Sequence, residues 1–362
     1  MSRGNIGVLP RPTRLADESY LEFVTSFRFL AIREFFPKVA AHGEAALAKA
    51  IETGEVTKPA DGEALKLGDI KRVFSKVPAA SAWQRFVRSQ QEMMWRRTRE
   101  SFYQDIDKLM ARMAAAAAKH PERIHIDPDF VVPDYTRKEI HCQPGGYTED
   151  PMGGIVFHYG TKVFYEGAND QDELHSELAE KVTMPADGRV ERILDIGCSI
   201  GQATTVFKDL HPQAEVWGLD VGAPLIRYAH MRAVESAKDV QFTQRLAEDN
   251  GFPDAHFDMV HSYILFHEVT VAAMKAIIAE TYRVLRPGGT FSIYEFPNNN
   301  KNQVPPAYRY LIDYDSRDNC EPYSPAFVAS DFRGILEAAG FTVEQGPHVS
   351  NPFLQSLVAT KN

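Results

Sequence analysis

The segment Ile193–Gln202, which reads ILDIGCSIGQ, decides the fold. Its apolar beginning predicts a strand over 193–196. Gly197 and Gly201 then predict a tight turn, and the following residues to about Leu210 predict a helix. In an open α/β sheet, ligands bind in the crevice outside the carboxyl ends of the strands, and glycines let the backbone approach a ligand closely. The segment therefore predicts a ligand-binding turn at the end of a buried strand.

Strands and helices alternate after this segment. The pattern predicts strands at 215–219, 240–244, 257–262 and 290–295, and helices at 224–236 and 271–285. Strands that alternate with helices at this spacing form a parallel sheet with helices on both faces. We therefore expect an α/β domain over residues 186–362.

The first 125 residues predict an all-helical domain. Apolar side chains recur every three or four residues over 20–35 and over 81–119, which is the spacing of one helix face. Pro37 breaks or kinks the first of these helices. This domain, residues 1–125, either covers the substrate site or forms a dimer interface.

Residues 126–185 predict a connector or lid. They are punctuated by proline and glycine, with β-like pieces at 155–157 and 162–165 and an amphipathic helix at 172–182. The glycines near Tyr147 favour a segment that closes over a ligand.

The composition excludes several function classes. Lysine and arginine number 40 against 49 aspartates and glutamates, so the formal net charge is −9, which argues against a bulk nucleic-acid binder. Three cysteines do not form a disulfide framework, and no stretch is long and apolar enough to span a membrane. We expect a reduced, cytoplasmic protein with no metal site, nucleic-acid partner or membrane segment.

Three kinds of site fit the turn after the first strand. A dinucleotide site requires G-x-G-x-x-G, but Ser199 stands where the second glycine would be. A serine hydrolase fits the G-x-S-x-G spacing, with Ser199 as nucleophile and Asp258 and His348 as partners. A nucleoside site explains Asp195 and also Asp220, because a carboxylate at the end of the next strand can accept both ribose hydroxyls.

Four motifs in order favour the nucleoside site. They read ILDIGCSIGQAT, WGLDVG, LAEDNGFPDAHFDMVHSYILFHEV and LRPGGTFSIYEF. The run 193–293 resembles the class I S-adenosylmethionine-dependent methyltransferases, particularly the ubiquinone and menaquinone C-methyltransferase branch. The resemblance implies a Rossmann-like, seven-stranded, mostly parallel sheet. It also implies that S-adenosylmethionine donates a methyl group to a small-molecule acceptor by in-line displacement. In this family, an insertion such as 298–324 helps to cover the acceptor pocket.

The resemblance also implies positions for the cofactor-binding residues. These are Asp195, Gly197, Cys198, Gly201, Asp220, Val221, Ala247, Glu248 and Ser262. The sequence departs from the family at Leu246, where many relatives carry aspartate. This departure supports an alternative, a relative that binds the cofactor without catalysing transfer.

The acceptor side of the site is predicted from strand ends and aromatic segments. A general base is needed only when the acceptor is a hydroxyl, a protonated amine or a carbon acid. The candidate catalytic residues are His267, Glu268 and Tyr294, and the candidate acceptor-binding residues are Tyr147, Tyr159, Glu295 and Tyr310. We expect a small-molecule acceptor as partner, with a homodimer as a further expectation.

Overall fold

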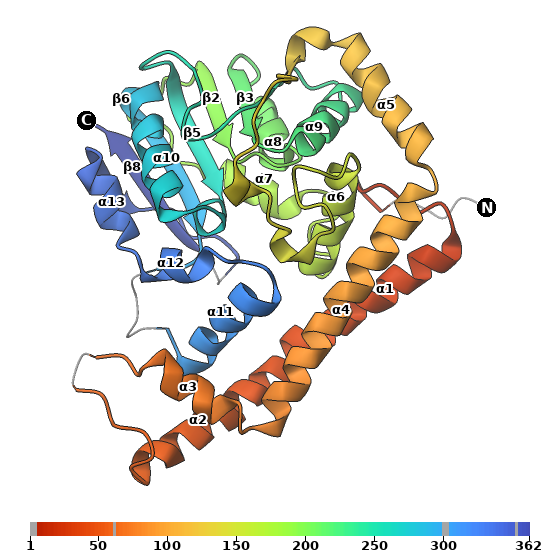
Figure 1. Ribbon diagram of the computed structural model, residues 1–362. Coiled ribbons are helices and arrows are strands. Elements are labelled where there is room, and N and C mark those ends of the chain that lie inside the picture. Colours follow the sequence, from red (N-terminus) through yellow and green to blue (C-terminus); the bar gives the residue numbers. More distant parts are fainter. Residues whose placement is uncertain (1–5, 61–62, 299–303, 352–353) are drawn as a thin grey trace.

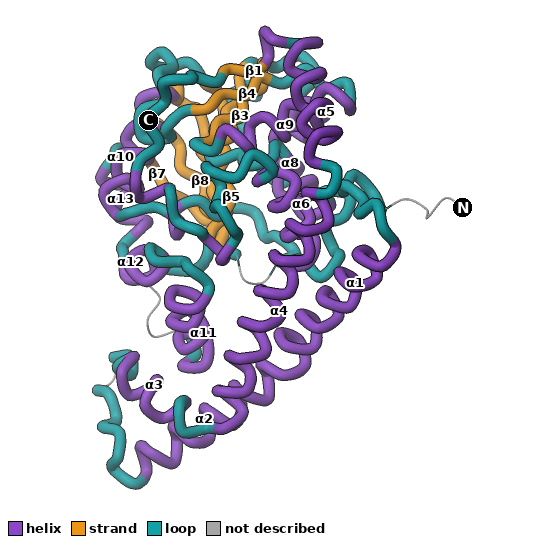
Figure 2. The backbone as a smooth tube through the Cα atoms, turned by 45° about the vertical axis from the view of Figure 1, so that its right-hand side comes forward, coloured by secondary structure: helices purple, strands orange, loops and turns teal. Residues whose placement is uncertain are grey.

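The computed structural model describes residues 6–60, 63–298, 304–351 and 354–362. It combines an α/β part with a helical arm, our name for the helices within residues 15–119 (Figure 1). In both views the long helices of the arm run side by side along one side of the α/β part (Figure 2).

The sheet has eight strands among the described residues, in the order β1-β4-β3-β2-β5-β6-β8-β7. The strands are β1 (Ile124–His125), β2 (Arg192–Ile196), β3 (Glu215–Asp220), β4 (Gln241–Gln244), β5 (Phe257–Tyr263), β6 (Leu285–Glu295), β7 (Phe341–Gln345) and β8 (Gln355–Lys361). Only β8 runs antiparallel to its neighbours. The predicted mostly parallel α/β sheet is confirmed.

The structure adds one strand to the predicted seven. Ile124 and His125 of β1 pair with Phe242 and Thr243 of β4 and so extend the sheet at its edge. Two residues carry no detectable period of two, so this strand depends on its partner rather than on a local sequence signal.

Helices cover both faces of the sheet. They are α8 (Gln202–Leu210) and α9 (Ala223–Glu235) on one face, and α10 (Val271–Val284) and α13 (Phe332–Ala338) on the other. Side chains of β2 alternate between the two cores, since Ile193 packs with α8 and α9 while Leu194 packs with α10. This period of two leaves the carboxyl ends of the strands as the accessible edge.

The arm is helical as predicted, with different boundaries. Its elements are α1 (Leu15–Phe29), the π-helical turn η1 (Leu30–Phe35), α2 (Phe36–Glu52), α3 (Leu67–Phe74), α4 (Pro78–Tyr103) and α5 (Ile106–Lys119). The predicted helix over 81–119 is interrupted between Tyr103 and Ile106. Pro37 does not break the helix, because α1, η1 and α2 follow one another without a gap. It comes directly after the π-helical turn, one of the features at which long helices bend.

The predicted β-like pieces at 155–157 and 162–165 are wrong. Both lie in or at the end of α6 (Gly153–Phe164), a helix that is buried between α4 and α9. A Cβ on Gly160 would lie 2.3 Å from the Trp95 ring, and one on Gly154 would lie 2.5 Å from Tyr228. Tertiary packing against two helices therefore overrides the local β propensity.

Three further helices complete the walls of the central cavity. They are α7 (Glu173–Glu180), α11 (Pro306–Asp318) and α12 (Ser324–Ala329). Within the predicted insertion 298–324, residues 299–303 lie outside the described part of the chain, and α11 packs against α2 and α3 of the arm. Across the described residues, every helix is too short or too polar to cross a lipid bilayer.

We expect Gly160→Ala to destabilise the protein by about 1–3 kcal/mol, because the added methyl group overpacks a site against the rigid Trp95 ring. Gly68→Ala in α3 is the matched control, since a Cβ there meets nothing within 4 Å and alanine favours a helix by up to about 1 kcal/mol. Urea unfolding of both variants measures the difference. Equal stability of the two variants would contradict the packing of α6 against α4.

Candidate active site

A cavity of about 1460 Å³ lies at the carboxyl ends of the strands. It is bounded by the turn after β2, the end of β5, helices α6 and α7, the arm and α11. Pockets for one small ligand usually measure about 300–1,000 Å³. The cavity therefore has room for two molecules side by side.

The turn after β2 forms the floor of this cavity. Gly197 has φ +66° and Gly201 has φ +72°, a region that glycine adopts without steric cost. A Cβ on Gly201 would lie 2.7 Å from the Phe242 ring. Ser199 also has a positive φ and lines the cavity, and its buried Oγ lacks a hydrogen-bond partner. The turn thus presents backbone and an unused hydroxyl to the cavity.

Asp195 is buried at the end of β2 and lines the cavity. One of its oxygens accepts a hydrogen bond from Thr204 Oγ1 at 2.6 Å, and the other lies 2.8 Å from His261 Nδ1. These two contacts orient the carboxylate below the turn.

Asp220 at the end of β3 is the second carboxylate of the floor. Its oxygens accept hydrogen bonds from the backbone N–H of Ser199 at 3.0 Å and of Gly222 at 2.8 Å. Burial raises the pKa of Asp220 to about 6, although both N–H donors act in the opposite direction. The carboxylate both ties the turn to β3 and faces the cavity.

The other predicted cofactor residues lie in different surroundings. Cys198 lines the cavity, and burial raises the pKa of its thiol well above the usual value. Glu248 accepts a hydrogen bond from the Tyr135 hydroxyl at 2.6 Å. Ser262 is fully buried in β5, and its Oγ has no partner among the described residues. Gly201, Val221, Ala247, Glu248 and Ser262 are not among the residues that line the cavity.

One wall of the cavity, which we call the polar wall, is built around His141, Glu268 and Glu321. The Nε2 atom of His141 lies 3.3 Å from Glu268 Oε1 and its Nδ1 lies 3.0 Å from Glu321 Oε1. Burial alone would lower the pKa of His141, but the two carboxylates outweigh it and raise the pKa to about 10. His141 is therefore a cation at neutral pH, and all three side chains line the cavity.

His267 and Glu295 form a buried pair behind this wall. His267 Nδ1 lies 2.8 Å from Glu295 Oε1, and the backbone N–H groups of Phe266 and Phe296 also donate to the Glu295 carboxylate. Burial favours neutral His267, but Glu295 outweighs it and raises the pKa of His267 to about 9. Neither side chain lines the cavity, although His267 Nε2 lies 3.9 Å from Glu268 Oε1.

Three predicted tyrosines need correction, because the structure places them outside the cavity. Tyr294 points to the face of the sheet that packs against α7, where its hydroxyl donates to the Leu178 carbonyl. The Tyr159 ring packs against Phe102 in the core between α6 and α4. The Tyr310 ring packs against Phe74 of the arm. Tyr147 lines the cavity, and its role in binding the acceptor stays a prediction.

The sequence interpretation missed several residues of the cavity. His141 and Glu321 are the main ones, followed by Arg28, Tyr165 and Tyr263. The Tyr165 and Tyr263 hydroxyls are 3.0 Å apart. The only signal for His141 was its place before the glycine pair of the connector, and Arg28 carried no signal at all.

The hydrolase alternative is wrong. Asp258 lies at the start of β5, where it accepts from the Arg192 backbone and pairs with Arg286. Ser199 lies at the carboxyl end of the parallel strand β2. Asp258 and Ser199 therefore lie at opposite ends of the parallel strands, too far apart to belong to one catalytic triad.

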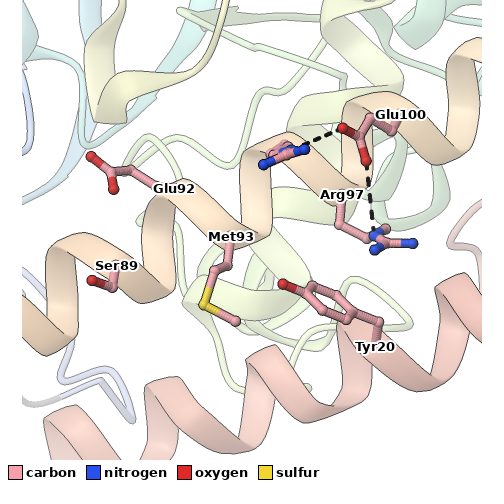
Figure 3. Close-up of a pocket in the computed structure, with 7 residues that line it drawn as sticks. Tyr20, Ser89, Glu92, Met93, Arg97 and Glu100 are labelled. Carbon is pink, nitrogen blue, oxygen red and sulfur yellow. Dashed lines mark hydrogen bonds and ion pairs between the residues drawn. The ribbon is translucent and has the colours of Figure 1, made fainter.

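A smaller hollow of about 490 Å³ lies between α1 and α4 (Figure 3). Its arginines are already paired, Arg96 with Glu100 at 2.9 Å and Arg97 with Asp17 at 2.8 Å. The Arg97 guanidinium also lies 4.4 Å from the centre of the Tyr20 ring. This hollow shares no residue with the large cavity.

Among the described residues, no group of three His, Cys, Asp or Glu side chains is arranged to hold a metal ion. The cavity has carboxylates at Asp220 and at Glu268 that can accept hydrogen bonds from an organic ligand.

Comparisons with known proteins agree with this geometry. The sequence model of a family described as a methyltransferase domain matches residues 193–289. An uncharacterised methyltransferase of Synechocystis is 29% identical over 173 residues, which cover 48% of this chain and 76% of the relative. A demethylmenaquinone methyltransferase of Thermus thermophilus is 34% identical over 167 residues, which cover 42% of this chain and 75% of the relative.

A solved structure is also similar. It is a geranyl diphosphate C-methyltransferase from Streptomyces coelicolor in complex with Mg²⁺, geranyl diphosphate and S-adenosyl-L-homocysteine. The match has a TM-score of 0.42 at 15% identity and covers 56% of this chain and 84% of that one.

We expect the affinity for S-adenosylhomocysteine to fall about tenfold between pH 7.5 and pH 5. Asp220 is ionised above its pKa of about 6, and a protonated carboxyl accepts fewer hydrogen bonds from ribose hydroxyls. Calorimetric titration at the two pH values measures the change. Asp220→Asn should bind weakly at both, with no dependence on pH. A wild-type affinity that is the same at both pH values would contradict the role of Asp220.

Proposed function

Because the chain belongs to the class I S-adenosylmethionine-dependent methyltransferases, we propose that it methylates a small-molecule acceptor whose reacting atom loses a proton to Glu268. The observation that carries this proposal is the free oxygen of Glu268 at the cavity. Its Oε1 is held by His141, while nothing in the described part of the chain hydrogen-bonds to Oε2.

The residues of the floor fit the cofactor. The Ser199 hydroxyl is buried at the cavity with no partner among the described residues, and Gly197, which packs against the Leu265 side chain, also lines the cavity. Asp220 would hold the ribose hydroxyls, and the backbone of the turn would face the methionine end. The bound cofactor supplies a methyl group on a sulfonium, which is an electrophile with a neutral leaving group.

The chain's own contribution is alignment and proton removal. Holding two reactants in line can contribute about 7–11 kcal/mol in the best intramolecular cases. Tyr147 and the Tyr165–Tyr263 pair line the space between floor and polar wall. A carboxylate fixed on one oxygen by a protonated histidine keeps its other oxygen aimed at the acceptor. His267 supports the same oxygen from behind.

The three predicted segments take different roles in this proposal. Residues 186–362 bind the cofactor, the connector 126–185 supplies His141, and the helices of residues 1–125 roof the acceptor site. The support for the last role is that side chains of α1, α2 and α4 line the same cavity as Asp220 and Glu268.

The first experiment is calorimetric titration with S-adenosylmethionine and S-adenosylhomocysteine, followed by an acceptor screen with a methyl-labelled cofactor. Micromolar binding and label transfer to a compound are the expected results. Absence of binding would overturn the cofactor site. Binding without transfer to any compound would favour a non-catalytic relative.

With an acceptor from that screen, we expect Glu268→Gln to lower kcat by about 100-fold or more, because a positioned base contributes roughly 10²–10⁴-fold. The affinity for S-adenosylhomocysteine at pH 7.5 should stay within about twofold, since the floor residues are unchanged and loss of the Glu268 charge only relieves one cause of the raised pKa of Asp220. Glu100→Gln on the outer side of α4 is the control and should keep wild-type turnover. An unchanged kcat in Glu268→Gln would exclude this residue as the base.

A further inference from the structure

Arg28 is a cation of the cavity that has no counter-ion among the described residues. It lies on α1 and lines the cavity. Its Nε donates to the Phe164 carbonyl at 3.3 Å, and its guanidinium lies 4.5 Å from the centre of the Phe164 ring. Arg28 lines the cavity, and no carboxylate of the described residues lies within ion-pair distance of it.

The two acids whose charges act most strongly on Arg28 are Glu166 and Asp315. Neither forms an ion pair with Arg28 in the described part of the chain. Glu166 is already paired with Arg33 at 2.9 Å. Burial and the neighbouring Glu321 raise the pKa of Asp315 to about 8, which favours its neutral form. Burial also lowers the pKa of Arg28, which is the expected response of a cation removed from water. A partly buried charge without a partner is unfavourable unless a ligand completes it.

The surroundings of Arg28 are apolar on one side. Three helix faces meet there, each with residues three or four positions apart. They contribute Ile32 and Phe36 after α1, Trp83 and Val87 from α4, and Tyr308, Leu311 and Ile312 from α11. Each face ends in a polar residue, namely Arg28, Gln91 and Asp315. These residues are close to His141, because Gln91 donates to the His141 carbonyl and the charges of His141 and Arg28 both act on Asp315. The cavity therefore has an apolar end in the arm and a polar end beside the reacting site.

Phe164 links Arg28 to the reacting site. The His141 ring lies 5.1 Å from the Phe164 ring, on which Arg28 also packs. The next residue, Tyr165, contacts Tyr263 at the carboxyl end of β5. A group held at Arg28 is thus close to the wall that carries Glu268, while the rest of the same molecule can extend into the arm.

We propose that Arg28 binds an anionic group of the acceptor, and that the acceptor is an apolar molecule with one carboxylate or phosphate group near its reacting atom. The planar guanidinium suits either oxyanion, because it donates two parallel hydrogen bonds. Pairing with Arg28 makes the oxygen atoms of that group weaker nucleophiles. The group therefore anchors the acceptor, and the methyl group goes to another atom. This inference rests on the proposed function for the identity of the site.

The test uses two dyes that differ in one charge, 8-anilinonaphthalene-1-sulfonate and the neutral N-phenyl-1-naphthylamine. Fluorescence titrations are made on full-length protein saturated with S-adenosylhomocysteine. We expect Arg28→Gln to weaken the sulfonate dye about 10- to 100-fold and the neutral dye less than about twofold. Arg28→Lys keeps the positive charge but not the planar pair of donors, so its affinity for the sulfonate dye should lie between those of wild type and Arg28→Gln. Arg33→Gln is the matched control, because Arg33 lines the same cavity but is paired with Glu166.

Displacement of the dye identifies the oxyanion. Decanoate or decyl phosphate should displace the sulfonate dye from the wild type at lower concentration than decanol, and the more effective of the two names the headgroup. Equal displacement by decanol, or equal loss of sulfonate binding in Arg28→Gln and Arg33→Gln, would overturn the proposal. Calorimetry with S-adenosylhomocysteine separates failure of this inference from failure of the proposed function. If the wild type does not bind S-adenosylhomocysteine, the proposed function fails. If it binds normally and Arg28→Gln binds the sulfonate dye as well as the wild type does, only the anion site is overturned.

Discussion

The ion bridge Glu268–His141–Glu321 is the interaction on which the polar wall of the cavity depends. Each member comes from a different segment: His141 from the connector, Glu268 from the turn after β5, and Glu321 from the chain after α11. One protonated ring between two carboxylates holds these segments together. The thiols of Cys142 and Cys320, the neighbours of His141 and Glu321, lie 3.5 Å apart and pack the same junction from outside. The polar wall is therefore a tertiary structure with no counterpart in any single stretch of chain.

Such a bridge is a costly way to close a cavity. Removing charges from water costs several kcal/mol per ion, and a buried pair contributes little net stability compared with apolar packing. Loss of one partner is more damaging, because it leaves an uncompensated charge. The structure spreads this cost: Asn319 Nδ2 donates to Glu321 at 3.0 Å, and His267 is held in turn by Glu295. These contacts favour a wall with one defined geometry, which is what a reaction that depends on alignment requires.

The sequence was sufficient for the sheet and the floor, and insufficient for the walls. Strands such as β2 and β5 are local patterns with a glycine turn at a fixed place, so Asp195 and Asp220 could be located from spacing. The choice of face was harder. Tyr294 and Glu295 are adjacent in β6, so their side chains point to opposite faces, and both could not face an acceptor. In α6, the contacts of Gly160 with Trp95 decide a helix that the local residues did not indicate. Contacts between segments more than 100 residues apart, such as His141 with Glu268, carry no periodicity to detect.

The division between floor and walls also explains why the cofactor was identified more readily than the acceptor. The family model matches residues 193–289, and this range includes the turn after β2, Asp220 and Glu268. Arg28, Trp83, His141, Tyr308 and Glu321 all lie outside that range, yet they line the same cavity. The methyl donor is the same throughout such a family, so the residues that hold it recur in recognisable motifs. The acceptor differs between members, and much of its wall here is built by segments that lie outside the matched range 193–289. Specificity for the acceptor therefore depends on the charges and shape of those segments. In our proposal, the Arg28 guanidinium beside the apolar end of the cavity constrains the acceptor more than the motifs do.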